Sequence, residues 1–366
     1  MSTGPAIERV EVSAYTVPTE TPESDGTFVW DKTTMVLVEV SAAGETGIGY
    51  TYADTATAHL IEQLLAAKIK GTNALANGAA WITLTSAIRN IGRPGIASMA
   101  IAAIDNALWD LKGKLLKTPV AVLLGLARTE ILAYGSGGFT SYSDEQLRRQ
   151  LGGWAEQGFR AVKMKIGRDA EADLHRVRVA RSAIGEGVKL FVDANGAYTR
   201  KQALAQAERF AGEFGVTWFE EPVSSDDLEG LRLLRDRAPA GMDIAAGEYG
   251  YDTLYLRRML EAEAVDVLQA DSTRCGGVTG FMAADALCES RSMPLSAHTA
   301  PSIHAHACCG ARRALNVEYF FDHARIEQMA FEGAIAVKQG YLHPNLSTAA
   351  FGLEFKREDM QKYRVA

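Results

Sequence analysis

The sequence predicts an α/β protein in which a parallel β-barrel follows a smaller α+β domain. The barrel prediction rests on eight short apolar runs, rich in β-forming residues, in the last two thirds of the chain. Amphipathic stretches of helical length separate most of these runs, as in repeated βα units. The runs span residues 131–136, 161–166, 190–195, 217–222, 243–248, 267–271, 294–298 and 315–319. Eight such units close into a barrel, and chemistry on such a barrel takes place where the strands end.

The first 128 residues lack this alternation and predict an α+β domain. Strands are expected at 6–16, 33–41 and 47–52, and helices at about 56–68, 74–90 and 97–115. The last helix is the strongest, because Ile101, Ile104, Leu108 and Leu111 recur at three- and four-residue spacing. Between the first two strands, residues 18–32 predict a polar loop with Phe28 and Trp30 near its end. Such a loop either closes over the barrel mouth or forms a surface hairpin.

Start signals mark two of the barrel helices. Ser143 with Gln146, and Thr199 with Gln202, each predict a capping box ahead of an amphipathic stretch. After the eighth run, no clear helix closes the barrel. The chain divides into a first domain at 1–128, a barrel at 129–338 and a tail at 339–366 that we expect to pack back against the first domain.

Composition narrows the class of protein. The chain is 47% hydrophobic and 23% charged, as is usual for a globular enzyme, and its net charge of −7 gives no reason to expect nucleic acid or an anionic membrane as partner. No apolar stretch is long enough to span a bilayer, and residues 1–10 carry no basic-then-apolar signal pattern. Four cysteines without a CxxC pair suit a reducing compartment. We therefore expect a cytoplasmic protein.

Three carboxylates follow successive predicted strands. Asp193, Glu220 and Glu248 end the third, fourth and fifth runs, at spacings of 27 and 28 residues. Carboxylates brought together repel one another, and a hard divalent cation relieves the repulsion. Oxygen ligands alone favour Mg²⁺ over zinc or copper. One such acid taken alone is more often a solvated loop residue, but three in successive units favour a metal site.

The sequence leaves open the roles of two residues that neighbour this triad. Asn195 lies two residues past Asp193 and is a candidate to support the site through a hydrogen bond. Glu221, next to Glu220, either supports the metal ligands or pairs with a nearby cation, and the sequence favours neither interpretation.

Lys163 and Lys165 alternate on the second predicted strand, so both side chains point to the same side. A lysine in a barrel mouth near other positive charge has its pKa lowered from about 10.4 toward neutrality, which makes it usable as a base. The alternative is a pair of surface lysines at a strand end. The flanking apolar residues favour the first interpretation.

Asp271 and His298 end the sixth and seventh runs and are therefore expected to be neighbours in the barrel. A carboxylate that holds one imidazole nitrogen leaves the other free to take or give a proton. Glu318, at the end of the eighth run, is expected beside His298, where it holds a substrate oxygen or acts as an electrophile. A single histidine beside an apolar run is usually structural, so the hypothesis depends on its pairing with Asp271.

Seven motifs together resemble the enolase superfamily, in particular the mandelate racemase branch of the mandelate racemase/muconate lactonizing enzyme family. They are VKMKIG, VDANG, WFEEP, GE at 247–248, QADSTRCGGVTG, SAH at 296–298 and NVE ending at Glu318. The resemblance covers nearly the whole chain. It implies a capping domain, a modified TIM barrel of the (β/α)₇β type, a C-terminal segment that returns to the cap, and a homo-oligomer.

The resemblance also implies roles for the site residues. Asp193, Glu220 and Glu248 would bind Mg²⁺. Lys165 would be the base on one face of the substrate, with Lys163 assisting the substrate carboxylate. His298, oriented by Asp271, would act on the opposite face, and Glu318 would hydrogen-bond the carboxylate. The muconate-lactonizing branch has a lysine at the sixth strand, where this chain has Asp271 and then Arg274, so the racemase-like arrangement is favoured.

The implied reaction begins with removal of the proton α to a carboxylate, which forms a metal-stabilised enolate. Our leading hypothesis is dehydration of a sugar acid, an aldonate or aldarate, to a 2-keto-3-deoxy acid. Racemisation or epimerisation of a 2-hydroxy acid comes next and cycloisomerisation third, whereas the intact triad and both bases disfavour a non-enzymatic binding protein. The expected partner is a small carboxylate. Candidates for further substrate contacts are Trp30, Ser136, Asn195, Tyr198, His323 and Arg325.

Overall fold

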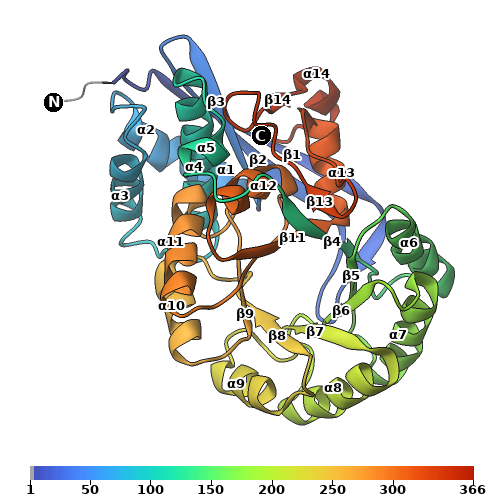
Figure 1. The fold of residues 1–366 in the computed structure, drawn as a ribbon. Helices are drawn as coiled ribbons and strands as arrows, with labels where there is room; N and C mark the ends of the chain where they lie inside the picture. Colours follow the sequence, from blue (N-terminus) through green and yellow to red (C-terminus); the bar gives the residue numbers. More distant parts are fainter. Residues whose placement is uncertain (1–3) are drawn as a thin grey trace.

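The computed structural model describes residues 4–366, and residues 1–3 of the predicted first domain lie outside this range. Figure 1 views a closed barrel along its axis, with a second substructure packed across its upper side. The first described residues and the C-terminus lie in that upper part (Figure 1).

Within the described residues, eight parallel strands form the barrel, and pairing of the last with the first closes it. Each predicted run forms one strand, so the barrel prediction is confirmed. The strands are β4 (Ile131–Gly137), β5 (Ala161–Lys165), β6 (Lys189–Asp193), β7 (Val216–Glu220), β8 (Asp243–Ala246), β9 (Val267–Ala270), β10 (Leu295–Ala297) and β11 (Ala314–Phe320).

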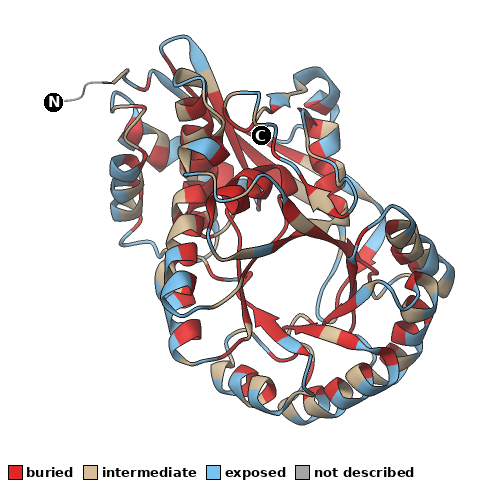
Figure 2. Ribbon diagram, viewed as in Figure 1, coloured by how far each residue is buried: buried red, intermediate tan, exposed pale blue. Residues whose placement is uncertain are grey.

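One helix lies between each pair of successive barrel strands in the described chain, which gives the (β/α)₇β order. They are α6 (Asp144–Glu156), α7 (Ala170–Ile184), α8 (Arg200–Phe214), α9 (Leu228–Arg237), α10 (Thr253–Glu261), α11 (Gly277–Ser290) and α12 (Pro301–Gly310). Both predicted capping boxes form, at Ser143 and at Thr199. Figure 2 shows buried faces of these helices turned toward the barrel, where their apolar side chains pack on the strands.

The cap is built on an antiparallel sheet of β1 (Arg9–Ser24), β2 (Val29–Ala42) and β3 (Glu45–Tyr52). Its helices are α1 (Thr55–Leu60), a π-helical turn η1 (Ile61–Leu65), α2 (Ala66–Ile69), α3 (Asn77–Ala87) and α4 (Ile96–Leu115), followed by the short α5 (Val120–Leu123). In the described part of the chain, no helix combines the length and the apolar character needed to cross a membrane.

The β1–β2 hairpin corrects the prediction of a polar loop at 18–32. Most of this segment is strand, with a shift in register between Pro18 and Glu23. The turn is confined to residues 25–28, where the Asp25 carboxylate accepts hydrogen bonds from the backbone N–H groups of Thr27 (2.6 Å) and Phe28 (2.7 Å). This local capping by an aspartate replaces a flexible loop with a tight turn.

The chain after the barrel corrects a second expectation, because a helix, α13 (Phe321–Ala330), follows β11 directly. It packs with cap residues rather than closing the barrel. The remaining elements are β12 (Phe331–Glu332), β13 (Tyr341–Leu342), β14 (Glu354–Phe355), α14 (Arg357–Met360) and the 3₁₀ turn η2 (Gln361–Tyr363). The N–H of Val365 donates to the carbonyl of Ala14 in β1 (2.8 Å), so the end of the tail contacts the cap. The domain limits at 128 and 338 stay predictions.

Two glycines let β3 lie against the backbone of α4. A Cβ atom on Gly49 would lie 2.3 Å from the Ala103 carbonyl oxygen and from the Ala107 amide nitrogen. A Cβ atom on Gly47 would lie 2.3 Å from the Ala107 carbonyl oxygen. Real side chains do not tolerate such distances, so a larger residue at either position must push the helix away from the sheet.

The close contact between β3 and α4 predicts that Gly49→Ala destabilises the protein by about 1–3 kcal/mol, the usual cost of an overpacked core. Gly78→Ala is the matched control, since it is also in the cap and a Cβ there meets no atom within 4 Å. Thermal unfolding midpoints measure both changes. We expect a lower midpoint for Gly49→Ala and an unchanged or higher one for Gly78→Ala; equal midpoints would contradict the packing argument.

Candidate active site

Three carboxylates converge at the carboxyl ends of β6, β7 and β8. One oxygen from each of Asp193, Glu220 and Glu248 lies within 4.8 Å of the others, and all three residues are buried. Strand register produces this arrangement, because Lys165 pairs with Asp193 and Asp193 pairs with Glu220 in adjacent strands. Side chains far apart in the sequence therefore share one layer at the barrel mouth.

This cluster fits a hard divalent cation. Its donors are all carboxylate oxygens, the ligands that Mg²⁺ prefers. The Oε2 atom of Glu248 is buried and accepts no hydrogen bond from the described residues, so it has free capacity for a ligand. Asp193, Glu220 and Glu248 would hold the ion.

Two buried lysines lie beside the cluster. The ammonium group of Lys163 contacts Glu220 and lies 2.8 Å from Glu318 Oε1 and 3.4 Å from Asp193 Oδ2. The ammonium group of Lys165 lies 2.5 Å from Asp193 Oδ2. The two cations therefore supply countercharge to carboxylates that water cannot solvate.

These contacts correct the expected direction of the lysine pKa shifts. Burial acts to lower the pKa of Lys163 and of Lys165, as does the positive charge of Lys163 on Lys165. The neighbouring carboxylates outweigh both effects and raise the pKa of each lysine above its ordinary value. The acids that lie beside the two lysines, and not burial or the neighbouring cation, therefore set the direction of the pKa shifts.

His298 pairs with Asp271 as expected from neighbouring strands. Its Nδ1 atom donates to Asp271 Oδ2 at 2.8 Å. Its Nε2 atom lies 3.3 Å from Glu248 Oε2 and 3.6 Å from Glu318 Oε2. Burial acts to raise the pKa of Asp271, yet the hydrogen bond and charge of His298 outweigh it and hold that pKa well below the usual range. Asp271 thus stays ionised, and the imidazole presents Nε2 to the carboxylate cluster.

A pocket of about 470 Å³ opens above these groups, between cap and barrel. This volume lies within the range of small-molecule sites. The cap lines it with Asp25, Phe28, Trp30, Lys32, Thr33, Thr34, Tyr52, Ala53 and Asp54. The barrel side lines it with Lys165, Asn195, Glu248, Tyr249, Arg274, His298, Thr299, Phe320 and His323.

The β1–β2 hairpin forms one wall of this pocket. A Cβ atom on Gly26, in its turn, would lie 2.6 Å from the Ala194 carbonyl oxygen and 2.7 Å from that of Ile166, so the turn rests directly on the loops after β5 and β6. Phe28 and Trp30 stack with ring centroids 6.1 Å apart. The hairpin therefore covers the barrel mouth and presents aromatic faces to the pocket.

His323 forms another part of the wall, from α13. Its ring stacks on Tyr52 of the cap, with centroids 3.6 Å apart. Burial, and after it the charge of His298, lowers the pKa of His323 to about 3. The ring is therefore neutral at physiological pH and is suited to hydrogen bonding with a substrate hydroxyl.

Other predicted residues lie nearby with different contacts. Asn195 lines the pocket, and its N–H donates to Asp193 Oδ1 (2.9 Å). Ser136 donates to Glu318 Oε1 (2.6 Å) and so supports that acid. Two candidates lie elsewhere, which corrects the expected substrate contacts. Tyr198 donates to Asp173 in the helix layer outside the strands, and Arg325 pairs with Asp322 and the Pro18 carbonyl.

Glu221 is buried beside the site. Among the described residues it forms no ion pair, so the interpretation as partner of a cation receives no support. Burial, and after it the charge of Glu248, raises the pKa of Glu221 well above its ordinary value.

Two cations of the pocket wall were not among the predicted site residues. Arg274 lies over the Tyr249 ring and reaches the Glu248 carbonyl (3.2 Å) and carboxylate (3.5 Å). Its place three residues after Asp271, on the same loop, was a usable signal. Lys32 lay in the predicted hairpin loop, but no sequence pattern distinguished it from other surface lysines.

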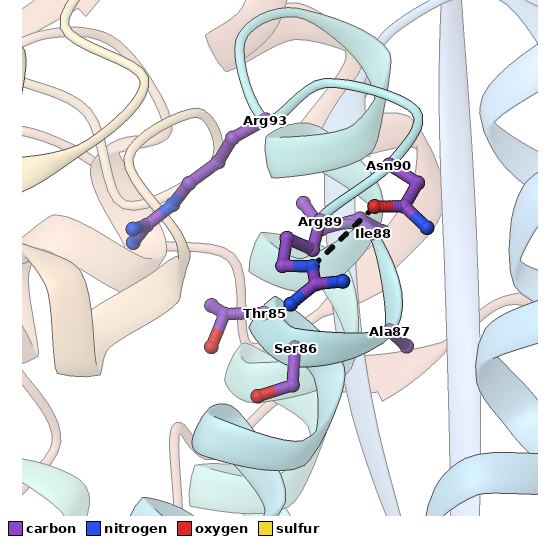
Figure 3. Close-up of a pocket in the computed structure, with 7 residues that line it drawn as sticks. All are labelled: Thr85, Ser86, Ala87, Ile88, Arg89, Asn90 and Arg93. Atoms are coloured by element: carbon purple, nitrogen blue, oxygen red, sulfur yellow. Dashed lines mark hydrogen bonds between the residues drawn. The ribbon is translucent and has the colours of Figure 1, made fainter.

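A second pocket, of about 630 Å³, lies on the cap at the end of α3 (Figure 3). Figure 3 shows Arg89 turned toward Asn90 and Arg93 extending away from it. The lining residues include no carboxylate, imidazole or lysine within the described chain. The residues that line this pocket therefore offer no anionic metal ligand and no group that transfers protons at neutral pH, in contrast to the barrel mouth.

Comparison with family models matches both parts of the chain. The model for the mandelate racemase / muconate lactonizing enzyme N-terminal domain matches residues 9–125. The model for the enolase C-terminal domain-like family matches residues 146–359.

Known proteins resemble the chain over most of its length. A 3,6-anhydro-alpha-L-galactonate cycloisomerase of Streptomyces coelicolor is 33% identical over 310 residues, covering 82% of this chain and 84% of that enzyme. A mandelate racemase/muconate lactonizing enzyme-like protein of Rubrobacter xylanophilus superposes with a TM-score of 0.97 at 53% identity, covering 99% and 100% of the two chains.

L-talarate/galactarate dehydratase of Salmonella typhimurium, solved with Mg and L-lyxarohydroxamate, superposes with a TM-score of 0.89 at 26% identity, covering 100% and 94% of the chains. The sequence and the fold agree with those of these relatives. The chain therefore belongs to the mandelate racemase/muconate lactonizing enzyme family of the enolase superfamily.

Proposed function

We propose that this protein is a Mg²⁺-dependent dehydratase of sugar acids, which converts an aldonate or aldarate into a 2-keto-3-deoxy acid. One observation carries the proposal. Lys165 and His298 approach the same carboxylate cluster from different strands, Lys165 at Asp193 (2.5 Å) and His298 at Glu248 (3.3 Å). A substrate seated at the cluster has a nitrogen base on either side. The dehydratase among the related structures supports this choice of reaction.

The chemistry follows from these two positions. When bound, Mg²⁺ supplies positive charge beside the substrate carboxylate and offsets the acids that hold the proton on Lys165. Lys165, once neutral, takes the α-proton, and the electron pair of that C–H bond moves into the substrate carboxylate to give an enolate. In a second step these electrons form a double bond between the α- and β-carbons as the β-carbon–oxygen bond breaks. His298 gives its Nε2 proton to the departing hydroxyl, which leaves as water. The resulting enol becomes the 2-keto acid by losing its hydroxyl proton and gaining a proton at the β-carbon.

Lys163 and Glu318 hold the acid end of the substrate in this proposal. They are a contact pair, 2.8 Å apart, directly beside the metal ligands. Lys163 stabilises the negative charge that develops on the substrate carboxylate, which is usually a large contribution in such reactions.

Epimerisation is the second candidate, because the same two nitrogens also allow a proton to leave one face and return on the other. Cycloisomerisation, in which a ring opens or closes, is the third candidate reaction, because one relative is a cycloisomerase. These reactions share the first step and differ in what His298 does next.

Lys32 supports a substrate with a second acid group. It lines the cap side of the pocket, and its ammonium group forms no hydrogen bond or ion pair with the described residues. The nearby acids are occupied locally, since Asp25 closes the hairpin turn and Asp54 caps α1. Lys32 is therefore free to pair with the distal carboxylate of an aldarate.

The two-base assignment predicts that loss of each base affects α-deuterium exchange and product formation differently. Proton NMR in D₂O, with Mg²⁺ and pooled aldonates and aldarates, measures both. Lys165→Ala should abolish both α-deuterium exchange and product, a loss of 10²-fold or more. His298→Asn should abolish product while α-exchange on the Lys165 face persists. Lys189→Ala, a lysine at the other end of the barrel, should change neither. The assignment fails if Lys165→Ala and His298→Asn both leave turnover unchanged.

The metal assignment predicts that Mg²⁺ raises the thermal midpoint of the protein, since a ligand of the native state stabilises it. Glu248→Gln should reduce this rise, because it replaces a charged ligand whose Oε2 accepts no hydrogen bond from the described residues. Glu229→Gln, a substitution at a 91% exposed side chain, should keep it. Chelation with EDTA should abolish turnover. An undiminished Mg²⁺ response in Glu248→Gln would remove that residue from the site.

The Lys32 proposal predicts a loss specific to diacids. Lys32→Met should lower kcat/KM for an aldarate by about fivefold, the effect of a partly exposed ion pair worth about 1 kcal/mol. The aldonate of the same sugar serves as control and should be unaffected. Equal effects on both substrates would show that Lys32 does not contact the second carboxylate.

A further inference from the structure

The loop of residues 271–276, after β9, carries Asp271, and the cap holds this loop and the start of α11 at several points. Thr51 of β3 donates its hydroxyl to the Thr273 carbonyl (2.7 Å). Asn106 of α4 donates to the Ser272 carbonyl (3.0 Å) and accepts from the N–H of Val278 (3.0 Å). A loop of the barrel is therefore fastened to two elements of another substructure.

Asp105, next to Asn106, extends this contact. It accepts from both the N–H (2.9 Å) and the hydroxyl (2.7 Å) of Thr279. Gly277 leaves room for it, since a Cβ there would lie 2.3 Å from Asp105 Oδ2. Helix α11, which starts at this glycine, packs along α4.

Inside the loop, hydrogen bonds lead from the cap to the imidazole. Asp271 Oδ1 accepts from the N–H (2.6 Å) and the hydroxyl (2.7 Å) of Thr273. Its other oxygen accepts from His298 Nδ1 (2.8 Å). Thr273 is the residue whose carbonyl Thr51 holds, so one series runs from Thr51 through Thr273 and Asp271 to His298.

His304 secures the same loop from the barrel side. Its Nε2 atom accepts from the Ser272 N–H (2.9 Å), and its Nδ1 atom donates to the carbonyl of Thr299 (2.7 Å), the residue after His298. Ser272 is thus bonded on one side by His304 and on the other by Asn106. The loop that bears Asp271 and the segment that bears His298 are joined through this ring.

Water does not substitute for these bonds. Thr51 and Asn106 are fully buried, and Thr273 and Asp271 are 1% exposed. A buried carbonyl that loses its donor stays unsatisfied, and the chain then shifts to recover a partner. The orientation of Asp271 depends on that backbone.

We propose that Thr51 and Asn106 of the capping domain are positioning residues for the Asp271–His298 pair. They set the direction in which His298 Nε2 faces the substrate, whereas Lys165 on β5 forms no hydrogen bond with either of them in the part of the chain that the structure describes. The inference rests on the proposed function in assigning proton transfer to His298. Its structural part, the control of the Asp271–His298 hydrogen bond by the cap, is measurable without a substrate.

Thr51→Val tests the proposal, because it removes the hydroxyl and keeps the shape of the side chain. Thr57→Val is the matched control: this threonine is also buried in the cap, and its hydroxyl has no partner among the described residues. Thr51→Ser restores the hydroxyl and should restore the wild-type behaviour. Thermal midpoints establish that each variant is folded.

The first readout is the NMR signal of the His298 Nδ1–H proton, in protein labelled with ¹⁵N-histidine and assigned with His298→Asn. We expect this signal to shift or broaden in Thr51→Val and to stay unchanged in Thr57→Val and Thr51→Ser. An unchanged signal in Thr51→Val overturns the proposal, whichever substrate and reaction the enzyme has.

The second readout is kinetic. Thr51→Val should lower kcat for product formation by about 10- to 100-fold, as expected for a small misplacement of a catalytic group, with KM within about twofold. Exchange of the α-proton on the Lys165 face should persist. Equal loss of exchange and product would indicate general damage to the site and overturn a role confined to His298.

Discussion

The arrangement of the site follows from negative charge that is buried where water hardly reaches. Four carboxylates carry this charge, those of Asp193, Glu220, Glu248 and Glu318. Such a group is stable only when cations lie within a few ångströms of it. The barrel supplies Lys163 and Lys165 from the adjacent strand, and a divalent ion completes the balance. The groups that neutralise the acids are also those that the proposed reaction uses, so stability and chemistry depend on the same contacts. The same carboxylates raise the pKa values of both lysines.

The barrel alone does not complete the site. Its strand register determines where the metal ligands and the lysines lie, but the pocket wall above them comes largely from the cap. The β1–β2 hairpin contributes the aromatic faces and Lys32, β3 contributes Tyr52, and α4 holds the loop that bears Asp271. Substrate selection and proton transfer thus depend on contacts between two substructures that the sequence encodes far apart.

Strand positions and the residues that end them were predictable, because period, β-propensity and polar termini are local properties of the chain. All eight runs became strands, and the three metal candidates lie together. The features that could not be predicted depend on tertiary contacts. The hairpin extends beyond its expected ends because it rests on the barrel, and the acids around Lys165 reverse its pKa shift. Tyr198 bonds Asp173 outside the strands, and Arg274 enters the pocket because of the fold of its loop.

The close contact of Gly47 and Gly49 with α4 has a consequence for how this enzyme can evolve. The contact fixes the spacing of β3 and α4, the two elements that bear Thr51 and Asn106. Mutations that alter this spacing impair catalysis whatever the substrate, so selection removes them. Among the described residues, the β1–β2 hairpin forms none of the hydrogen bonds that hold the Asp271 loop, so the side chains that it turns toward the pocket are free to diverge. New substrate preferences should therefore arise by drift in the hairpin, while β3 and α4 stay as they are through each change of specificity.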